Sequence, residues 1–118
     1  MTIQSENVHI YEIIKHGESD TVEFKLSFSD MSDILKTICA FANHKGGIIL
    51  VGVDDSGYVS GVDIDSQTLN RLENTIRETI EPRIYVDISI KAINNKNIVI
   101  IRVPEGINKP YFYRGICY

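Results

Sequence analysis

The chain has 118 residues, of which 43% are hydrophobic and 24% are charged, a composition typical of one globular domain. The formal net charge of −4 excludes a protein that coats nucleic acid through bulk positive charge, so any phosphate binding must be local. The apolar runs 48–51 and 98–101 are too short to cross a bilayer, and no charged-then-apolar leader follows Met1, which predicts a soluble, cytoplasmic protein.

The first part of the chain predicts a helix, a strand and a second helix. Residues 6–16 carry apolar side chains at helical spacing before Gly17, which indicates a short lead-in helix. Residues 21–26 alternate apolar and polar side chains, so Glu23 and Lys25 share the solvent face of a strand. A buried helix follows over residues 29–42. Its N-cap candidates are Ser29, Asp30 and Ser32, and its apolar stripe consists of Ile34, Leu35, Ile38, Phe41 and Ala42.

Two glycines separate this helix from the most apolar strand. Gly46 or Gly47 is expected to take the left-handed conformation of a helix C-terminus. Residues 48–53 are apolar at nearly every position, which predicts a central strand covered on both faces. The acidic turn 54–57 then leads into a short strand at residues 58–60 and completes a hairpin.

The second half predicts one more helix and a second hairpin. The helix is capped by Asp65 or Ser66, presents Glu73 and Arg77 as an exposed i, i+4 pair, and is stopped by Pro82. Strands over residues 86–92 and 98–103 flank a turn at residues 94–97. A loop over 104–110 precedes an extended segment at 111–114. These elements predict an α+β fold, in which a mixed, largely antiparallel sheet packs with two main helices.

The glycine spacing of residues 52–57 resembles a phosphate-binding loop only superficially. Tyr58 and Val59 occupy the positions where such a loop needs its lysine and its serine or threonine. A nucleotide-hydrolysing loop is therefore rejected. The cysteines, Cys39 and Cys117, form no CxxC pair, which excludes a disulfide framework and a structural zinc site. Both are expected to be reduced, packed thiols.

Three acidic positions are candidates for a cation site. Glu18 and Glu23 bracket the entry to the first strand, and Asp54 or Asp55 would join them if that strand pairs beside residues 48–53. Carboxylate oxygens suit Mg²⁺ or Mn²⁺, which can orient a nucleophilic water on a phosphodiester. The simpler interpretation has the glutamates as turn and surface residues and the aspartates bonding their own turn amides.

Basic and aromatic residues supply candidates for nucleic-acid contacts. The candidate phosphate ligands are Lys25, Lys45, Lys109 and Arg114. The aromatic side chains available to stack on bases are Tyr111, Phe112 and Tyr113. Taken singly, each basic residue fits an ordinary solvated surface charge equally well.

An ordered series of motifs resembles the Schlafen AlbA_2 family, also called divergent AAA-4. The motifs are Glu18-Ser-Asp-Thr-Val-Glu23-Phe-Lys25, Ala40-Phe-Ala-Asn43, Gly46-Gly47, Gly52-Val-Asp-Asp55, Gly61, Pro110 and Tyr113-Arg114-Gly115. The resemblance divides the chain into a helical lead-in, residues 1–16, and an AlbA_2-like domain, residues 17–118. Because the family pattern continues further, we expect the chain to be the N-terminal fragment of a longer protein.

The resemblance implies a nucleic-acid-binding, presumed DNA-binding, module of transcriptional regulators or helicase-related proteins, without an ATP site. Some animal Schlafen proteins cleave tRNA or rRNA with three acidic residues, which correspond by motif to Glu18, Glu23 and Asp55. A metal-dependent endoribonuclease using Mg²⁺ or Mn²⁺ is therefore the alternative. This chain lacks the second lobe of the animal proteins, which a homodimer would supply. A dimerisation or scaffold module, favoured by the acidic charge, is the third hypothesis.

Overall fold

A computed structural model describes the backbone of residues 2–118 and the side chains from His9 onward. The helices are α1 (Thr2–His16), α2 (Met31–Asn43) and α3 (Thr68–Thr79). The strands are β1 (Val22–Lys25), β2 (Gly47–Val51), β3 (Ile80–Glu81), β4 (Asp87–Ile93), β5 (Lys96–Val103), β6 (Phe112–Tyr113) and β7 (Ile116–Cys117). No helix within residues 2–118 has both the length and the apolarity needed to span a membrane.

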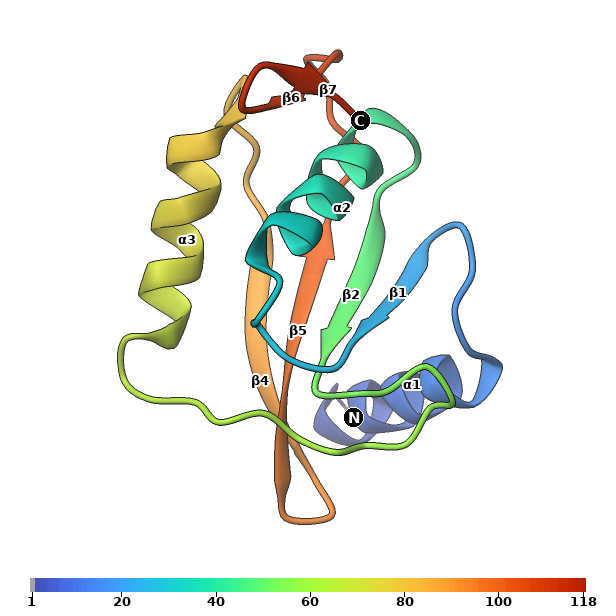
Figure 1. Ribbon diagram of the computed structural model, residues 1–118. Coiled ribbons are helices and arrows are strands. Elements are labelled where there is room, and N and C mark those ends of the chain that lie inside the picture. The colour runs from blue at the N-terminus through green and yellow to red at the C-terminus, as the bar shows by residue number, and fades with distance from the viewer. Residues whose placement is uncertain (1) are drawn as a thin grey trace.

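The main sheet has the strand order β1-β2-β5-β4, and a smaller sheet has the order β3-β6-β7. β1 runs parallel to β2, whereas β5 is antiparallel to both β2 and β4. The predicted mixed, largely antiparallel sheet is therefore confirmed. Its lower end in Figure 1 carries the β4–β5 turn and the loop after β2, and the small sheet lies at its upper end.

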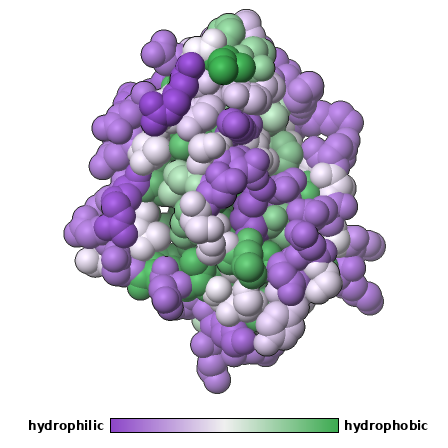
Figure 2. Space-filling view, in the orientation of Figure 1, coloured by the Kyte–Doolittle hydropathy of each residue, from purple (hydrophilic) through white to green (hydrophobic). Residues whose placement is uncertain are grey.

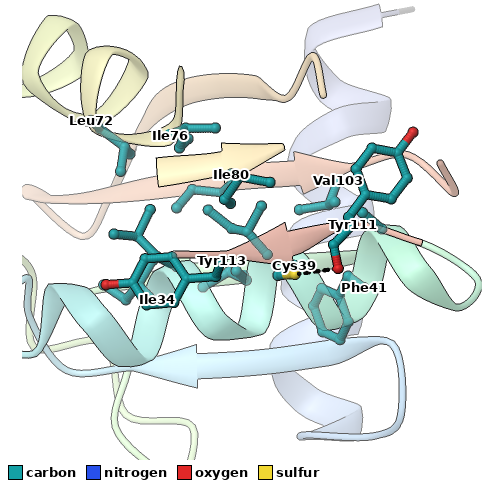
Figure 3. Close-up of a cluster of buried hydrophobic side chains, with 14 of the residues drawn as sticks. Ile34, Cys39, Phe41, Leu72, Ile76, Ile80, Val103, Tyr111 and Tyr113 are labelled. Carbon is teal, nitrogen blue, oxygen red and sulfur yellow. Dashed lines mark hydrogen bonds between the residues drawn. The ribbon is translucent and has the colours of Figure 1, made fainter. Parts of the chain in front are cut away.

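The helices cover both faces of the main sheet (Figure 1). α2 and α3 bury one face, where Ile49 and Val51 of β2 contribute to the larger hydrophobic cluster, and α1 covers the opposite face beside Leu50. The side chains of Ile49, Leu50 and Val51 are fully buried, which confirms the prediction of a central strand. Figure 3 shows the larger cluster, in which the Cys39 thiol donates a hydrogen bond of 3.3 Å to the carbonyl oxygen of Tyr111.

The double glycine ends α2 as predicted. Gly46 has φ +79°, and its N–H donates a 2.8 Å hydrogen bond to the carbonyl oxygen of Phe41. A Cβ at Gly46 would lie 2.6 Å from the carbonyl oxygen of Val103. A glycine is therefore required here both for its backbone conformation and for the close approach of β5.

The structure corrects the predicted third helix at both ends. α3 begins only at Thr68, after an N-cap position at Gln67 that has no side-chain cap. The Asp65 carboxylate accepts a hydrogen bond from the Gln67 N–H instead. The Arg77 guanidinium donates to the Asn74 amide oxygen at 2.9 Å and makes no ion pair with Glu73 among the side chains described. Residues 80–81 form β3, which the helical pattern conceals.

The structure also corrects the predicted boundaries of other elements. Residues 58–60 are not a strand, since only an isolated bridge joins Val53 to Val59. The side chain of Leu26 is not part of the core: β1 ends at Lys25, and Leu26 is 57% exposed. The turn between β4 and β5 is shorter than expected, because Asn94 and Asn95 have φ of 51° and 64° and reverse the chain alone.

Asn43 attaches the C-terminal segment to α2. Its amide oxygen accepts from the Tyr111 N–H at 2.7 Å, and its amide nitrogen donates to the carbonyl oxygens of Tyr111 and Tyr118 at 3.0 and 2.8 Å. Tyr111 and Tyr113 are consequently buried, with 1% and 6% exposure. Their predicted role in base stacking is therefore wrong. Cys117 is exposed rather than packed.

Candidate functional site

The acidic candidates Glu18 and Glu23 lie side by side at the outer edge of β1. An antiparallel bridge joins Ser19 to Val22, so the same register places Glu18 opposite Glu23. The Glu18 carboxylate accepts a 2.8 Å hydrogen bond from the Phe24 N–H, on the free edge of the strand. The Glu18 carboxylate therefore pairs with a backbone N–H at the free edge of β1 that would otherwise have no partner in the sheet.

The aspartate pair occupies the turn that follows β2. The Asp54 carboxylate accepts hydrogen bonds from the hydroxyl and the N–H of Ser56, at 2.7 and 2.9 Å, and from the N–H of Tyr58 at 2.9 Å. Asp55 is exposed. The turn packs against α1, since a Cβ at Gly57 would lie 3.3 Å from the carbonyl oxygen of Ile14. Asp54 therefore holds the turn, while Asp55 faces solvent.

The Asp54 turn should be sensitive to acid. The hydrogen bonds from the Ser56 hydroxyl and the Tyr58 N–H lower the pKa of Asp54 below its ordinary value. The stabilisation is therefore present at neutral pH and is lost as the pH falls through the folded-state pKa. We expect Asp54→Ala to lower the urea midpoint at pH 7 and to differ less from the wild type below roughly pH 4. Asp55→Ala is the control, and an equal pH-dependent loss in both variants would contradict this role of Asp54.

The third acidic candidate reaches the same corner of the molecule but does not complete a metal site. Glu18 follows the end of α1 by two residues, and the Asp55 turn contacts α1 at Ile14. Among the residues described, no three histidine, cysteine, aspartate or glutamate side chains are grouped to hold a metal ion. The Glu18 oxygen bonds a backbone amide, and Glu23 lies 3.4 Å from the ammonium of Lys25. In this arrangement the carboxylates do not fit a shared divalent cation.

The Lys25 side chain is paired with two carboxylates. Its ammonium contacts both Glu23 on its own strand and Asp33 in the first turn of α2. Only 18% of the Lys25 side chain is exposed. The side chain therefore joins β1 to α2, and it is the least accessible of the predicted phosphate ligands.

The other predicted phosphate ligands lie toward the opposite end of the sheet from the Asp55 turn. Lys45 is 76% exposed and forms only a solvent-exposed pair with Asp20, at 3.6 Å, which contributes little. The Lys109 ammonium lies 2.7 Å from the Glu105 carboxylate and donates to the His44 carbonyl oxygen. Arg114 lies over the Tyr113 ring at 5.7 Å, in the turn that joins β6 to β7.

A basic hollow of about 430 Å³ opens between α1 and the upper ends of β2 and β5. Its basic lining side chains are His9, Lys45 and Arg102, and none of its described lining residues is acidic. The β2–β5 register pairs Ile48 with Arg102, which brings Arg102 beside the turn that carries Lys45. We call these three residues the basic hollow.

Sequence reasoning missed two members of the basic hollow. Arg102 directly follows the apolar run 98–101 within β5, and a charge at that position is the signal that would have identified it. Its cross-strand neighbour on β4 is Asp87, yet no ion pair within 4.0 Å joins them in the part of the chain that is described. His9 becomes relevant only through the packing of α1 on the sheet. Lys45 is the predicted residue that this surface retains.

The outer surface is otherwise mainly hydrophilic on the face shown in Figure 2. Apolar areas are small there and are separated by polar side chains. This face therefore lacks the broad apolar patch that marks many permanent protein interfaces.

Comparisons with known proteins agree on the fold. A family model described as Schlafen, AlbA_2 matches residues 18–118. The chain is similar to the N-terminal domain of an ATP-dependent DNA helicase RecG-related protein from Nitrosomonas europaea, with 24% identity, a TM-score of 0.63, and coverage of 83% of this chain and 69% of that chain. It is also similar to a Corynebacterium diphtheriae protein, with 16% identity and a TM-score of 0.70 over 91% of this chain. That match spans only 26% of the Corynebacterium chain.

Proposed function

Because the chain belongs to the Schlafen AlbA_2 family, we propose that it is a nucleic-acid-binding domain that contacts phosphates through the basic hollow. The observation that carries the proposal is the hollow itself, where Lys45 and Arg102 lie beside His9 and none of the described lining residues is acidic. Such a local site reconciles phosphate binding with a net charge of −4, since phosphate contacts act over about a Debye length, roughly 8–10 Å.

DNA is the proposed target, in a transcriptional regulator or a helicase-related protein. Two facts support it: the family resemblance, and the similarity to a domain whose parent protein is named as DNA helicase RecG-related. The hollow offers guanidinium, ammonium and imidazole donors, which contact the backbone phosphates common to all sequences. We therefore propose binding that is largely independent of base sequence at this surface.

Fluorescence anisotropy tests the proposed function directly. The full chain is titrated into a labelled DNA duplex and into the corresponding single strand at low salt. We expect dissociation constants on the order of 10⁻⁴–10⁻⁶ M, the range of non-specific binding. Absence of binding to either form at low salt would overturn the proposal.

RNA cleavage is the second candidate function, and the placement of Glu18 opposite Glu23 and of the Asp55 turn against α1 favours it. It requires Glu18 and Glu23 to exchange their present partners, the Phe24 N–H and the Lys25 ammonium, for a shared cation. It predicts that the chain cuts tRNA in buffer with Mn²⁺ and that Glu23→Gln lowers the rate at least tenfold. Glu78→Gln, on the exposed side of α3, serves as the control. Intact tRNA, or cleavage that survives Glu23→Gln, removes this candidate. Self-association stays a prediction that sedimentation velocity tests separately.

A further inference from the structure

A second cationic surface lies at the β4 edge of the main sheet, outside the basic hollow. A small hollow of about 70 Å³ is lined there by Arg77 of α3 and by Arg83 and Tyr85, which precede β4. Glu73 is the only carboxylate among its described lining residues, so two guanidiniums leave an excess of one positive charge. We call Arg77, Arg83 and Tyr85 the edge cluster.

Tyr85 is exposed although its neighbours are not. Ile84, Val86 and Ile88 pack against the larger hydrophobic cluster. Since side chains alternate along an extended chain, Arg83, Tyr85 and Asp87 point away from that cluster. The side chain of Tyr85 is 75% exposed to solvent. Burial in the core therefore does not explain an aromatic residue at this position.

The cations of the edge cluster are bonded only to neutral groups among the described side chains. The Arg83 guanidinium lies 5.5 Å from the centre of the Tyr85 ring and donates to its hydroxyl at 3.4 Å. Arg77 donates to the amide oxygen of Asn74. Neither guanidinium is in an ion pair with the described side chains, so both are able to donate to an anion, and the Arg83 contact limits the orientations of the ring.

We propose that the edge cluster holds one unpaired nucleotide, with its base stacked on Tyr85 and its phosphate bound by Arg77 and Arg83. An aromatic ring can stack on a base only when that base has left the duplex stack, so the surface selects single strands. This inference rests on the proposed function and specifies its substrate class.

One cross-strand pair of the main sheet relates the edge cluster to the basic hollow. Asp87 is the cross-strand neighbour of Arg102, and Tyr85 precedes Asp87 by two residues, or about 7 Å of extended chain. The Asp87 carboxylate lies between the two surfaces, so a strand of nucleic acid that contacts both must pass this negative charge. The hollow supplies sequence-independent attraction, and the edge cluster supplies the preference for unpaired bases.

Paired titrations with a single-stranded oligonucleotide and with its duplex test this inference. Tyr85→Leu is expected to bind the single strand roughly 5- to 100-fold more weakly and to bind the duplex like the wild type. Tyr85→Trp is expected to retain single-strand binding because it keeps an aromatic face. Tyr58→Leu is the matched control: Tyr58 is 60% exposed and has the Lys96 ammonium 5.1 Å from its ring centre, at the other end of the sheet.

The outcomes distinguish failure of the edge cluster from failure of nucleic-acid binding as a whole. If the wild type binds both forms and Tyr85→Leu loses no single-strand affinity, the edge cluster is overturned while nucleic-acid binding by the chain is supported. If the wild type binds neither form, both proposals fail. Circular dichroism verifies the fold of Tyr85→Leu. The double variant Arg77→Met, Arg83→Met gives a second measurement, in which an unchanged preference for the single strand also contradicts the inference.

Discussion

Replacing Gly46 with alanine is expected to lower the free energy of unfolding by about 3 kcal/mol or more, because strain and overpacking act together. Gly46 has φ +79°, a conformation that side chains disfavour. An added Cβ would also lie 2.6 Å from the Val103 carbonyl oxygen and 2.8 Å from the Glu105 nitrogen. These are backbone atoms at the end of β5, so relief would require the strand to move away from β2.

Gly17→Ala separates the two causes. Gly17 has a nearly identical φ of +87°, and nothing lies within 4 Å of the position its Cβ would take. Its replacement should therefore cost only the conformational strain, about 1–2 kcal/mol. Urea unfolding of the two variants measures the difference. Equal losses at Gly17 and Gly46 would contradict the steric role of the β5 contact.

Reversing the charges of the basic hollow is expected to weaken nucleic-acid binding roughly 10- to 100-fold at low salt, since two phosphate contacts are lost and two repulsions are introduced. The variant is Lys45→Glu with Arg102→Glu. Neither side chain is part of the hydrophobic clusters, so the fold should be retained. Anisotropy titrations with duplex and single-stranded DNA measure the effect.

A charge-matched control distinguishes a local site from net charge. Arg71→Glu with Lys96→Glu changes the net charge by the same amount. Both positions lie toward the lower end of the molecule in Figure 1, where α3 and β5 begin. We expect this control to bind several-fold better than the hollow variant. Equal losses in both double variants would mean that general electrostatic attraction, rather than the hollow, governs binding.

Local patterns were sufficient to predict the elements that carry strong periodicity. The apolar run of β2 and the helical stripe of α2 both express burial directly in the sequence, and Gly46 marks the change of direction between them. β3, β6 and β7 have two residues each, which is too short for any period to appear. β3 forms because Ile80 pairs with Tyr113 across a long stretch of sequence, whereas β6 and β7 pair with each other in a tight local hairpin.

The candidate site was harder to predict, because its members are assembled by tertiary contacts. By residue type alone, Lys25 is a candidate phosphate ligand. In the fold, however, its ammonium pairs with the carboxylate of Asp33 on α2. By residue type alone, Tyr111 is a candidate for stacking on a base. In the fold, however, Asn43 binds its backbone and its ring is buried in the core. Arg102 joins Lys45 only through the pairing of β5 with β2. None of these contacts leaves a signal in local spacing.

The salt dependence of DNA binding tests the central claim most directly. The logarithm of the association constant is measured against the logarithm of salt concentration for the wild type and for the double variant Lys45→Ala, Arg102→Ala. Each phosphate contact contributes about one to the slope. We therefore predict a wild-type slope that is steeper than that of the variant by roughly two. Identical slopes for the two proteins would contradict phosphate binding in the basic hollow.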